Sequence, residues 1–367
     1  MYCVGMHRMR PNDEQNTMIL YKNDIAQLTE LIDSHTKTFL LLDENSENYC
    51  LQILKNNAPL KSDAIKIVIP SGEQNKNIET VQFIWSKLIE NHADRKSLLI
   101  NLGGGMVTDI GGFAASCYQR GIDFINIPTT LLAMVDASVG GKTGIDFQGL
   151  KNQIGVFSQP LAVVILFEFL ATLPKRELLS GLAEIIKYGF ISDKYFLLAS
   201  LSGNPSCPVN TKLIKNSIEV KADIASNDAN EQGNRKILNF GHTVGHALET
   251  YLVENHQDIK HGEGVALGMV SALYLSEKYC NLDHKVTLYY KKLYAKTFNR
   301  FDLDGIPVGE LLEIMRHDKK NQDGHIRFVL IYDLMKPVYD VVVEEMDVVE
   351  SVNYLVEYLK DENYWGK

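Results

Sequence analysis

The sequence predicts a two-domain chain, with an α/β domain over residues 1–172 and a mainly helical domain over residues 173–367. Short, almost wholly apolar runs alternate with amphipathic stretches in the first half, which is typical of a parallel sheet covered by helices on both faces. A glycine-rich segment directly follows one of these runs. Strand-like runs nearly disappear after Pro174, where long helical periodicities begin. A chain of 367 residues is long enough for two such domains.

The first domain is expected to contain six strands and three helices. Apolar runs of four to six residues indicate the strands, and apolar residues three and four apart indicate the helices. The expected strands cover residues 18–21, 38–42, 65–69, 98–102, 124–127 and 163–166, and the expected helices cover residues 25–32, 78–90 and 106–118.

Several polar or glycine residues follow these strands at their carboxyl ends, which is where open α/β sheets bind ligands. Asp43 could bind a ribose diol, and Gly103 to Gly105 would let a pyrophosphate approach a helix N-terminus. Thr129 and Thr130 add hydroxyl groups. The glycines do not form the G-x-G-x-x-G fingerprint, because Thr108 occupies the third position, so a tight strand–helix turn is the alternative.

A second glycine-rich segment runs from Asp136 to Gly144 and encloses Lys142. Lys151 and Asn152 follow shortly afterwards. Glycines allow the backbone to approach a ligand, and lysines supply point charges for phosphate or carboxylate groups. The spacing is not that of a Walker A loop.

In the second half, helices are expected at 176–191, 217–228, 267–279 and 347–367, with one strand at 326–330. Residues 235–246 predict a further helix with Arg235, Asn239, His242 and His246 on one stripe, because residues three and four apart share a helix face. His261 lies beyond it in a turn bounded by glycine. These histidines are either hydrogen-bonded core residues or part of a metal site.

Glu184 precedes Lys187 by three residues within an apolar helix, so its carboxylate is expected to be buried and either paired or bound to a metal. One Glu and two His form a common ligand set for Zn²⁺. Glu184 and His242 could be completed by His246 or by His261, and the spacing does not distinguish the two. A simple Glu–Lys surface pair is the alternative.

Composition limits the partners that we expect. The net charge of −9 argues against a nucleic-acid partner, because phosphate backbones require a basic face. The five cysteines are scattered without CxxC spacing, which favours reduced thiols in the cytoplasm. We find neither an apolar leader near Met1 nor an uncharged run of membrane-spanning length, so no membrane partner is expected.

Taken together, the motifs resemble those of the 3-dehydroquinate synthase family. They span residues 71–320 and comprise Gly103-Gly-Gly, Asp109, Gly112-Phe-Ala, Arg120-Gly, Pro128-Thr-Thr-Leu-Leu-Ala, Val135-Asp136, Ser-Val-Gly-Gly-Lys142-Thr-Gly, Lys151-Asn152, Gly181-Leu-Ala-Glu184, Lys187-Tyr-Gly, Arg235-x-x-Leu-Asn239-Phe-Gly-His242-Thr-x-Gly-His246 and His261-Gly-Glu. The resemblance implies a Rossmann-like N-terminal domain, an all-α C-terminal domain, NAD⁺, one Zn²⁺ or Co²⁺ ion and a homodimer. It implies that 3-deoxy-D-arabino-heptulosonate 7-phosphate is converted to 3-dehydroquinate and phosphate in the shikimate pathway, through transient oxidation by NAD⁺, phosphate elimination, reduction and aldol closure.

The resemblance also implies roles for individual residues. The metal ligands would be Glu184, His242 and His261. The catalytic residues would be Lys142, Lys187, Lys221, Arg235, Asn239 and His246. The substrate would also contact Arg120, Asp136, Lys151, Asn152 and Lys319 or Lys320. NAD⁺ would be held by Asp43, Ser71, Gly72, Glu73, Lys76, Gly104, Gly105, Met106, Asp109, Thr129, Thr130, Lys142, Lys151, Phe169 and Thr172.

Two other enzyme classes are alternatives. One is a sugar-phosphate cyclase that makes an inosose or a valiolone from a substrate without the carboxylate. Arg235, Asn239, Lys319 and Lys320 favour an acidic substrate instead. The other is a metal- and NAD-dependent polyol dehydrogenase, which would accumulate NADH, whereas the cyclase regenerates NAD⁺.

Overall fold

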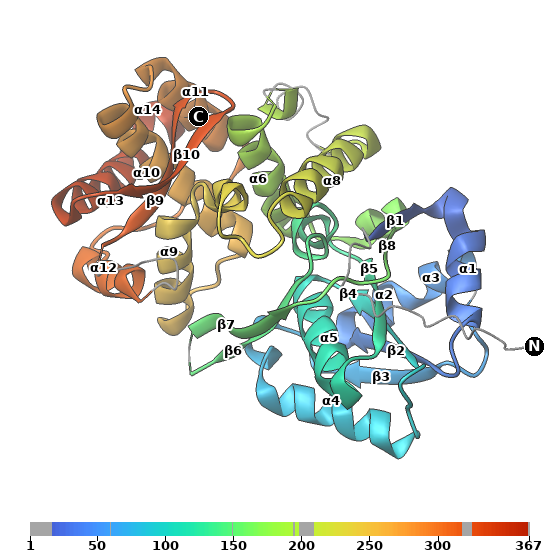
Figure 1. The fold of residues 1–367 in the computed structure, drawn as a ribbon. Helices are drawn as coiled ribbons and strands as arrows, with labels where there is room; N and C mark the ends of the chain where they lie inside the picture. The colour runs from blue at the N-terminus through green and yellow to red at the C-terminus, as the bar shows by residue number, and fades with distance from the viewer. Residues whose placement is uncertain are drawn as a thin grey trace, which may run out of the picture. The chain divides into compact units, whose positions relative to one another are not determined.

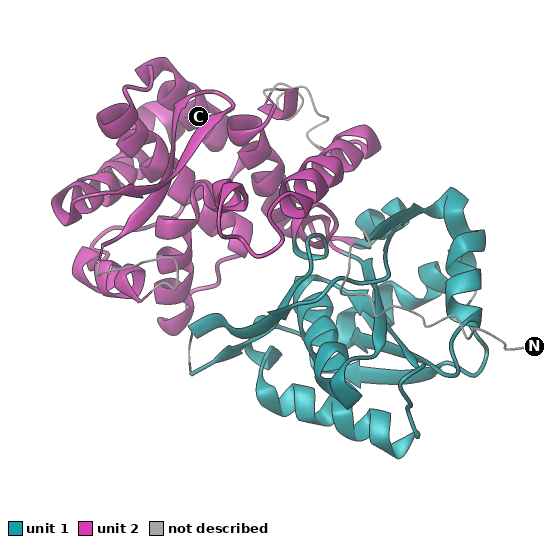
Figure 2. Ribbon diagram, viewed as in Figure 1, with its two compact units in different colours: residues 1–129, 137–172 teal, residues 130–136, 173–367 magenta. Residues whose placement is uncertain are grey.

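The computed structural model describes residues 17–58, 60–148, 150–193, 195–197, 209–317 and 325–365. The chain forms two compact units, one of residues 1–129 and 137–172 and the other of residues 130–136 and 173–367 (Figure 2). Residues 130–136 therefore belong to the second unit although they precede most of it in sequence. No helix in the described part of the chain is both long and apolar enough to cross a membrane.

The first unit is built on a parallel sheet of six strands in the order β1-β8-β5-β4-β2-β3 (Figure 1). Its buried strands are almost entirely apolar, as expected for a sheet with both faces covered. All six predicted strands are present. They are β1 (Met18–Tyr21), β2 (Thr38–Asp43), β3 (Ile65–Ile69), β4 (Leu98–Gly103), β5 (Asp123–Pro128) and β8 (Ala162–Ile165).

The strand order reverses between β2 and β4, which are hydrogen-bonded neighbours. From β2 the chain continues outward to β3, whereas from β4 it continues to β5 on the other side. A reversal of this kind opens a crevice at the carboxyl ends of the strands, where open α/β sheets bind nucleotides. Asp43 ends β2 and Gly103 ends β4, so the residues predicted to bind a nucleotide lie at this switch point.

Helices and a hairpin complete the first unit. The predicted helices are α1 (Ile25–Asp33), α4 (Ile78–Glu90) and α5 (Gly105–Cys117), whereas α2 (Glu44–Tyr49) and α3 (Leu51–Asn57) were not predicted. The short 3-10 helices are η1 (Lys22–Asp24), η2 (Glu73–Asn75), η3 (Tyr118–Arg120) and η5 (Phe167–Thr172). The second glycine-rich segment leads into an antiparallel hairpin of β6 (Lys142–Phe147) and β7 (Leu150–Phe157). Gly140 and Gly141, both with positive φ, form the turn before β6.

The second unit is mainly helical and contains one antiparallel strand pair, β9 (Arg327–Asp333) and β10 (Lys336–Val342) (Figure 1). The predicted α/β domain and helical domain are thus confirmed, with this strand pair as the β-structure of the helical one. The other elements are η4 (Ala133–Ala137), α6 (Lys175–Ile191), α8 (Thr211–Ser226), η6 (Asn234–Asn239), α9 (His242–Glu254), α10 (His261–Cys280), α11 (His284–Thr297), α12 (Val308–Arg316), α13 (Glu345–Lys360) and α14 (Glu362–Trp365).

The prediction of one continuous helix over residues 235–246 is wrong. A 3-10 turn covers Asn234–Asn239, and helix α9 begins only at His242. Gly241 separates them because its φ of 80° lies in the left-handed region, which ends regular helical geometry. Arg235 and Asn239 therefore do not share a helix face with the two histidines. The prediction of a turn around His261 is also wrong, since His261 is the first residue of α10.

Helices α9 and α10 pack backbone against backbone through glycines. A Cβ atom built on Gly268 of α10 would lie 1.9 Å from the carbonyl oxygen of Gly241. One built on Gly245 of α9 would lie 2.7 Å from the carbonyl oxygen of Gly264. Such distances exclude any side chain at these positions. The close approach brings the first turns of the two helices, and hence His242 and His261, next to each other.

Candidate metal and substrate site

Three imidazole rings converge in the second unit. His242 and His246 are one turn apart on α9, and His261 begins α10. Nitrogen atoms of the three rings all lie within 4.8 Å of one another. The ring centroids of His242 and His261 are 5.4 Å apart. Neutral imidazole is a frequent ligand of transition metals, so this cluster has the composition and spacing of a metal site.

Glu184 on α6 adds a carboxylate to this cluster. Its Oε1 atom lies 3.6 Å from Nε2 of His242 and 3.6 Å from Nε2 of His261. The side chain is fully buried, and its Oε1 atom has no hydrogen-bond partner among the described residues. Burial alone would raise the pKa of Glu184, but the ion pair between its Oε2 atom and Lys187 keeps this pKa below its usual value. A buried, charged oxygen with two imidazole nitrogens nearby fits a divalent cation.

Two lysines surround Asp136 beside this carboxylate. Lys221 Nζ of α8 lies 2.6 Å from Asp136 Oδ1, and Lys187 Nζ of α6 lies 3.8 Å from the same atom. The Tyr188 hydroxyl lies 3.0 Å from that oxygen and 2.8 Å from the carbonyl oxygen of Val135, and it can donate its hydrogen to either. Burial alone would raise the pKa of Asp136, but the two ammonium groups hold it well below its usual range. The two Nζ atoms therefore lie on one side of a buried carboxylate, where they could also contact an anionic substrate.

Close packing of α6 against residues 130–136 makes this arrangement possible. A Cβ atom on Gly181 would lie 2.5 Å from Leu131 Cγ and 2.6 Å from the backbone nitrogen of Leu132. The missing side chain lets the segment that carries Asp136 lie directly on α6. Lys187 and Tyr188, two turns further along α6, are then within reach of the Asp136 carboxylate.

Arg235 and Asn239 are held by the loop that precedes η6. Arg235 is buried and donates from Nη1 to the carbonyl of Ala229 at 2.9 Å, while its backbone nitrogen donates to Asp228 at 3.0 Å. Asn239 donates to Glu231 Oε1 at 3.0 Å. The structure therefore fixes both side chains through neighbouring acidic or carbonyl groups instead of through a shared helix face.

Most of the residues predicted to bind NAD⁺ lie in the first unit. Gly104 caps α5, and Asp43 caps α2 by accepting a hydrogen bond from Ser46 N at 2.7 Å. Thr129 donates its backbone N–H to the carbonyl of Gly103 at 2.9 Å, which joins the ends of β4 and β5. This places a helix N-terminus, an acid and a threonine at the switch point of the sheet.

Lys76 lies at the centre of a buried polar cluster in the same unit. Its Nζ atom is 2.6 Å from Asp109 Oδ2, 2.6 Å from Asn152 Oδ1 and 3.4 Å from Glu73 Oε1. Burial alone would lower the pKa of Lys76, but Asp109 and Glu73 raise it well above its usual value. Four of the predicted site residues are thus brought together by hydrogen bonds.

Other predicted site residues of the first unit are more dispersed. Lys142 is exposed at the start of β6, and Lys151 is half-buried in β7. Arg120 is exposed and has a positive φ of 68°. Ser71 and Gly72 follow β3. The remaining predicted contacts are Met106 at the start of α5, Phe169 and Thr172 in η5, and Thr130, which belongs to the second unit.

The Phe169 side chain is fully buried, so a cofactor could reach only its backbone. Lys319 and Lys320 lie outside the described residues.

Sequence reasoning missed two residues that the structure places at the site. Glu249 Oε2 lies 3.1 Å from His261 Nδ1, and the Tyr188 hydroxyl binds Asp136. Glu249 could have been found, because it lies three residues after His246 and seven after His242, on the same face of a helix that begins at His242. Tyr188 gave no signal, because its partner, Asp136, belongs to a segment more than fifty residues earlier in sequence.

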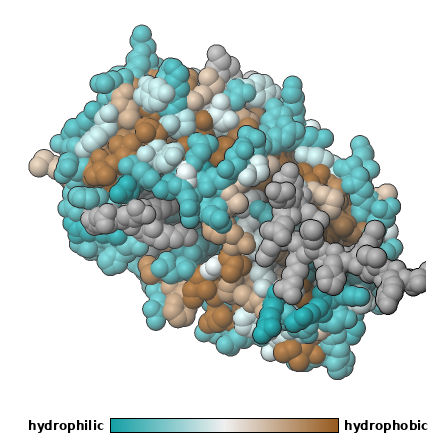
Figure 3. Space-filling model, in the orientation of Figure 1, coloured by the Kyte–Doolittle hydropathy of each residue, from teal (hydrophilic) through white to brown (hydrophobic). Residues whose placement is uncertain are grey.

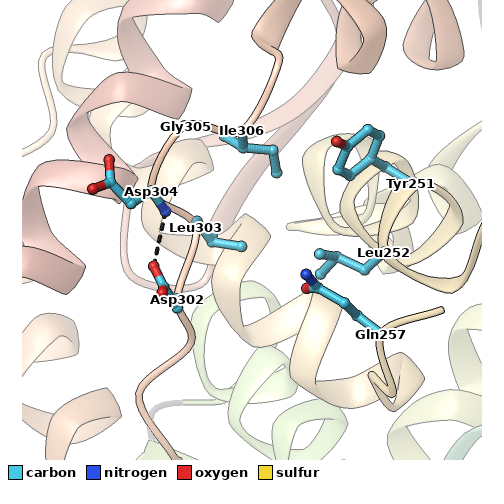
Figure 4. A pocket seen from close by; sticks show the side chains of 8 residues that line it. All are labelled: Tyr251, Leu252, Gln257, Asp302, Leu303, Asp304, Gly305 and Ile306. Atoms are coloured by element: carbon cyan, nitrogen blue, oxygen red, sulfur yellow. Dashed lines mark hydrogen bonds between the residues drawn. The ribbon is translucent and has the colours of Figure 1, made fainter. Parts of the chain in front are cut away.

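A pocket elsewhere in the second unit lacks this chemistry. Its cavity volume is about 90 Å³, and it is lined by Tyr251, Leu252, Gln257, Asp302, Leu303, Asp304, Gly305 and Ile306 (Figure 4). The charged side chains in this lining are the carboxylates of Asp302 and Asp304. The lining therefore contains no cation for a phosphate or carboxylate ligand, and none of the predicted site residues.

Comparison with known proteins tests the resemblance directly. The family model for the N-terminal part of 3-dehydroquinate synthase matches residues 66–180, and that for its C-terminal part matches residues 181–321. The chain belongs to the 3-dehydroquinate synthase family. A family member from Parabacteroides distasonis, a 3-dehydroquinate synthase, is 40% identical over 350 residues, which cover 93% of this chain and 98% of the relative. The resemblance is therefore confirmed, and the chain is a phosphate-eliminating cyclase of a family that uses NAD⁺ and a divalent metal ion.

Solved structures confirm the fold. A 2-epi-5-epi-valiolone synthase from Streptomyces hygroscopicus subsp. jinggangensis with bound NAD⁺ and Zn²⁺ superposes with a TM-score of 0.82, at 23% identity over 97% of this chain and 100% of that one. A glycerol dehydrogenase from Schizosaccharomyces pombe gives a TM-score of 0.65, at 14% identity over 94% of this chain and 90% of that one. Other cyclases and dehydrogenases thus share the architecture, so the choice of substrate depends on the site and not on the fold.

Proposed function

We propose that this protein converts 3-deoxy-D-arabino-heptulosonate 7-phosphate to 3-dehydroquinate and phosphate, with NAD⁺ and one divalent metal ion as cofactors. The observation that carries the proposal is the position of the buried Glu184 Oε1 atom, 3.6 Å from Nε2 of both His242 and His261. This arrangement occurs in a chain whose sequence identity to 3-dehydroquinate synthases extends over almost its full length.

Glu184, His242 and His261 are the proposed metal ligands. The His242–His246–His261 cluster is the alternative set, because its nitrogen atoms also lie close together. Glu184 is favoured because its buried Oε1 atom has no hydrogen-bond partner among the described residues and faces Nε2 of both His242 and His261. A divalent ion bound there would lower the pKa of a substrate hydroxyl and polarise the ketone formed from it. His246 then lies beside the ligands and can contact the substrate or transfer a proton.

The residues around Asp136 and Arg235 are proposed to bind and orient the substrate. Lys187 and Lys221 are held in place by ion pairs with Asp136 and could bind a carboxylate or phosphate. Arg235 and Asn239 are fixed by their own partners, so their remaining donors have defined positions. Lys142, Arg120, Lys151 and Asn152 are proposed further substrate contacts. Positioning of this kind places the reacting carbon atoms for elimination and ring closure.

NAD⁺ is proposed to bind the first unit at the carboxyl ends of β2 and β4. Gly104, Gly105 and Met106 present backbone N–H groups at the N-terminus of α5, which favours the pyrophosphate. Asp43 is proposed to bind a ribose, and Lys76 with Asp109 to order the adjoining loop that contains Ser71 and Glu73. Bound NAD⁺ would accept a hydride from the substrate alcohol and return it after phosphate leaves, so the cofactor is regenerated.

The test is phosphate release followed together with NADH absorbance. Purified protein with the heptulosonate phosphate, NAD⁺ and Zn²⁺ or Co²⁺ is expected to release phosphate while NADH does not accumulate. Steady accumulation of NADH from a polyol would instead support a dehydrogenase. Faster turnover of a glucose or heptose phosphate would support an inosose or valiolone cyclase. Absence of phosphate release with every metal would exclude the proposal.

A cytoplasmic homodimer is also proposed, and an exposed edge supports the dimer. Strand β7 pairs only with β6 among the described strands, and Phe147, Leu150, Ile154, Val156 and Phe157 of the hairpin are exposed. Apolar atoms gather over this hairpin in Figure 3. An apolar strand at the edge of a sheet is usually covered, and a second copy of the chain could pack on this hairpin. Val156→Lys is expected to lower the dimer fraction in light scattering, whereas Glu254→Lys, on the exposed end of α9, is not.

A further inference from the structure

Both ring nitrogens of His261 are directed at carboxylates. Nδ1 lies 3.1 Å from Glu249 Oε2, and Nε2 lies 3.6 Å from Glu184 Oε1. Glu249 is itself buried, with 5% of its surface exposed. A carboxylate is costly to bury, so this side chain requires a strong donor such as an imidazole N–H group. The contact with His261 therefore explains how the Glu249 carboxylate can be buried, although Glu249 has no role in the proposed reaction.

His242 is held in the same way by a different acceptor. Its Nδ1 lies 3.1 Å from the carbonyl oxygen of Phe240, and its Nε2 lies 3.6 Å from the Glu184 oxygen that faces His261. A carbonyl oxygen can only accept a hydrogen bond, so Nδ1 of His242 carries a proton and Nε2 is the nitrogen that an ion would bind. An ionised carboxylate also only accepts. Nδ1 of His261 therefore also carries a proton, and in both rings a bound ion would take the place of any proton on Nε2, the nitrogen that faces Glu184 Oε1.

The backbone places Glu249 for this contact. Glu249 lies two turns beyond His242 on α9, so it is on the helix face that carries His242 and His246. A Cβ atom built on Gly264 of α10 would lie 3.6 Å from Glu249 Cβ. The first turn of α10, which begins at His261, is thus packed against Glu249. The N-terminus of α10 is capped by Lys260 and Glu263. Glu249 is therefore not needed as the cap of that helix.

We propose that Glu249 is a positioning residue for the metal site: it accepts the Nδ1 hydrogen of His261 and fixes the tautomer in which Nε2 can bind the ion. This inference rests on the proposed ligand role of His261. The buried negative charge behind the ring also makes the imidazole a stronger ligand. Carboxylate partners of metal-bound histidines commonly change metal affinity about 10- to 100-fold.

The test compares Glu249→Gln with wild type and with Glu254→Gln, an exposed glutamate on the same helix. Gln keeps the size of the side chain but removes its charge and can donate a hydrogen bond to Nδ1, which favours the wrong tautomer. Zn²⁺ affinity is measured by competition with a chromogenic chelator. Glu249→Gln is expected to bind Zn²⁺ about 10- to 100-fold more weakly than wild type, and Glu254→Gln to bind it within about twofold. The visible absorption bands of bound Co²⁺ are expected to change in Glu249→Gln alone.

An unchanged Zn²⁺ affinity and Co²⁺ spectrum in Glu249→Gln would overturn the inference. A second measurement uses the wild-type protein, so it does not depend on whether the variant folds. Two-bond ¹⁵N–¹H spectra of Zn²⁺-loaded, ¹⁵N-histidine-labelled protein, assigned with His261→Gln, are expected to show the His261 proton on Nδ1. A proton on Nε2 would overturn the inference.

These measurements need no substrate, so they are independent of the proposed reaction. A wild-type protein that binds Zn²⁺ through His261 but releases no phosphate would refute the proposed reaction and leave the role of Glu249 intact. A wild-type protein that binds no metal would refute both.

Discussion

Each unit buries a lysine beside carboxylates, and the two lysines differ in how completely their surroundings are paired. In the first unit, Lys76 has three oxygen acceptors, and those at Asp109 and Asn152 are both 2.6 Å away. In the second unit, Lys187 pairs with Glu184 Oε2, while Glu184 Oε1 faces two imidazole nitrogens at a distance too long for a hydrogen bond. The first cluster is complete within the chain, whereas the second has a place for a ligand.

A charge cluster that only stabilises the fold and one that binds a ligand can be told apart by comparing the two lysines. Burial does not separate them, because Lys76 and Lys187 are both almost inaccessible to solvent. The pairing of the carboxylate oxygens does, since a buried oxygen without a partner costs free energy unless a ligand binds it. Mutations should therefore affect folding in the first cluster and metal binding in the second.

The largest expected effect is the loss of metal from the incomplete cluster. His242→Ala is expected to weaken Zn²⁺ binding by about 10⁴-fold, because it removes one of three protein ligands. His246→Ala is the matched control and should retain Zn²⁺ while turnover falls. Zn²⁺ content after dialysis and phosphate release measure the two effects. Equal metal loss in both variants would show that His246 is a metal ligand and that the proposed set of Glu184, His242 and His261 is wrong.

Mutation of the first cluster, around Lys76, should lower the stability of the protein. Lys76→Met is expected to lower the free energy of unfolding by about 3–5 kcal/mol, because it leaves Asp109 as a buried charge without its main partner. Urea unfolding without NAD⁺ measures this change.

Lys87→Met is the control for Lys76→Met, since Lys87 makes an exposed pair with Glu90 and should change stability by less than about 1 kcal/mol. A small effect of Lys76→Met would show that the cluster is not structural, and the contrast with the second unit would be lost.

The stability that the second cluster, around Glu184 and His261, gives to the fold should depend on pH when no metal is bound. Burial alone would lower the pKa of His261, but Glu249 and Glu184 raise it to about 10, above the usual 6.5. The protonated ring therefore stabilises the fold fully below pH 6.5, and this contribution is lost as pH rises towards 10. The unfolding free energy of metal-free wild type, relative to His261→Gln, should fall by at most about 1.4 kcal/mol per pH unit in this window.

Zn²⁺ should abolish this pH dependence, because the ion replaces the proton on His261. A wild-type protein whose metal-free stability did not change relative to His261→Gln between pH 6.5 and 10 would contradict the assignment.

The smallest effect is expected at Lys291, a buried lysine whose ammonium group faces three tyrosine rings. Lys291 Nζ of α11 lies 4.7, 4.9 and 4.8 Å from the ring centroids of Tyr354, Tyr358 and Tyr364. Lys291→Met should lower the unfolding free energy by about 1–2 kcal/mol, because cation–π contacts with α13 and α14 are lost. Thermal unfolding measures the change, with the exposed Lys292→Met as control. An equal effect of both variants would assign the loss to helix α11 instead of to the tyrosines.

Local pattern was sufficient to predict most of the first unit. Its buried strands are continuous apolar runs such as 38–42 and 98–102, and their order along the chain placed Asp43 and Gly103 at the same sheet edge. Helices α2 and α3 were missed because residues 44–57 are largely polar and lack a clear apolar period. Hairpin β6–β7 was missed because its glycines suggested a loop, whereas Gly144 and Gly155 face each other across the two strands.

The candidate site was predictable in its residue types but not in its geometry. The spacing of Arg235, Asn239, His242 and His246 fits a single helix, yet one residue, Gly241, adopts a positive φ and breaks it. Contacts between distant segments, such as Asp136 with Lys221 and Tyr188, depend on tertiary packing that no local window contains. The resemblance to a family identified these residues as a group, and the structure shows which of them touch.

The glycine contacts between α9 and α10 have a consequence for the entropy of ion binding. His242 and His261 are the first residues of helices whose backbones touch at Gly241 and Gly268, so their separation is set by main-chain packing. Ordering two ligands that are far apart in sequence is then part of the entropic cost of folding. Little of that cost remains when the ion arrives, and the affinity of the site reflects the ligand bonds more directly than in a flexible loop.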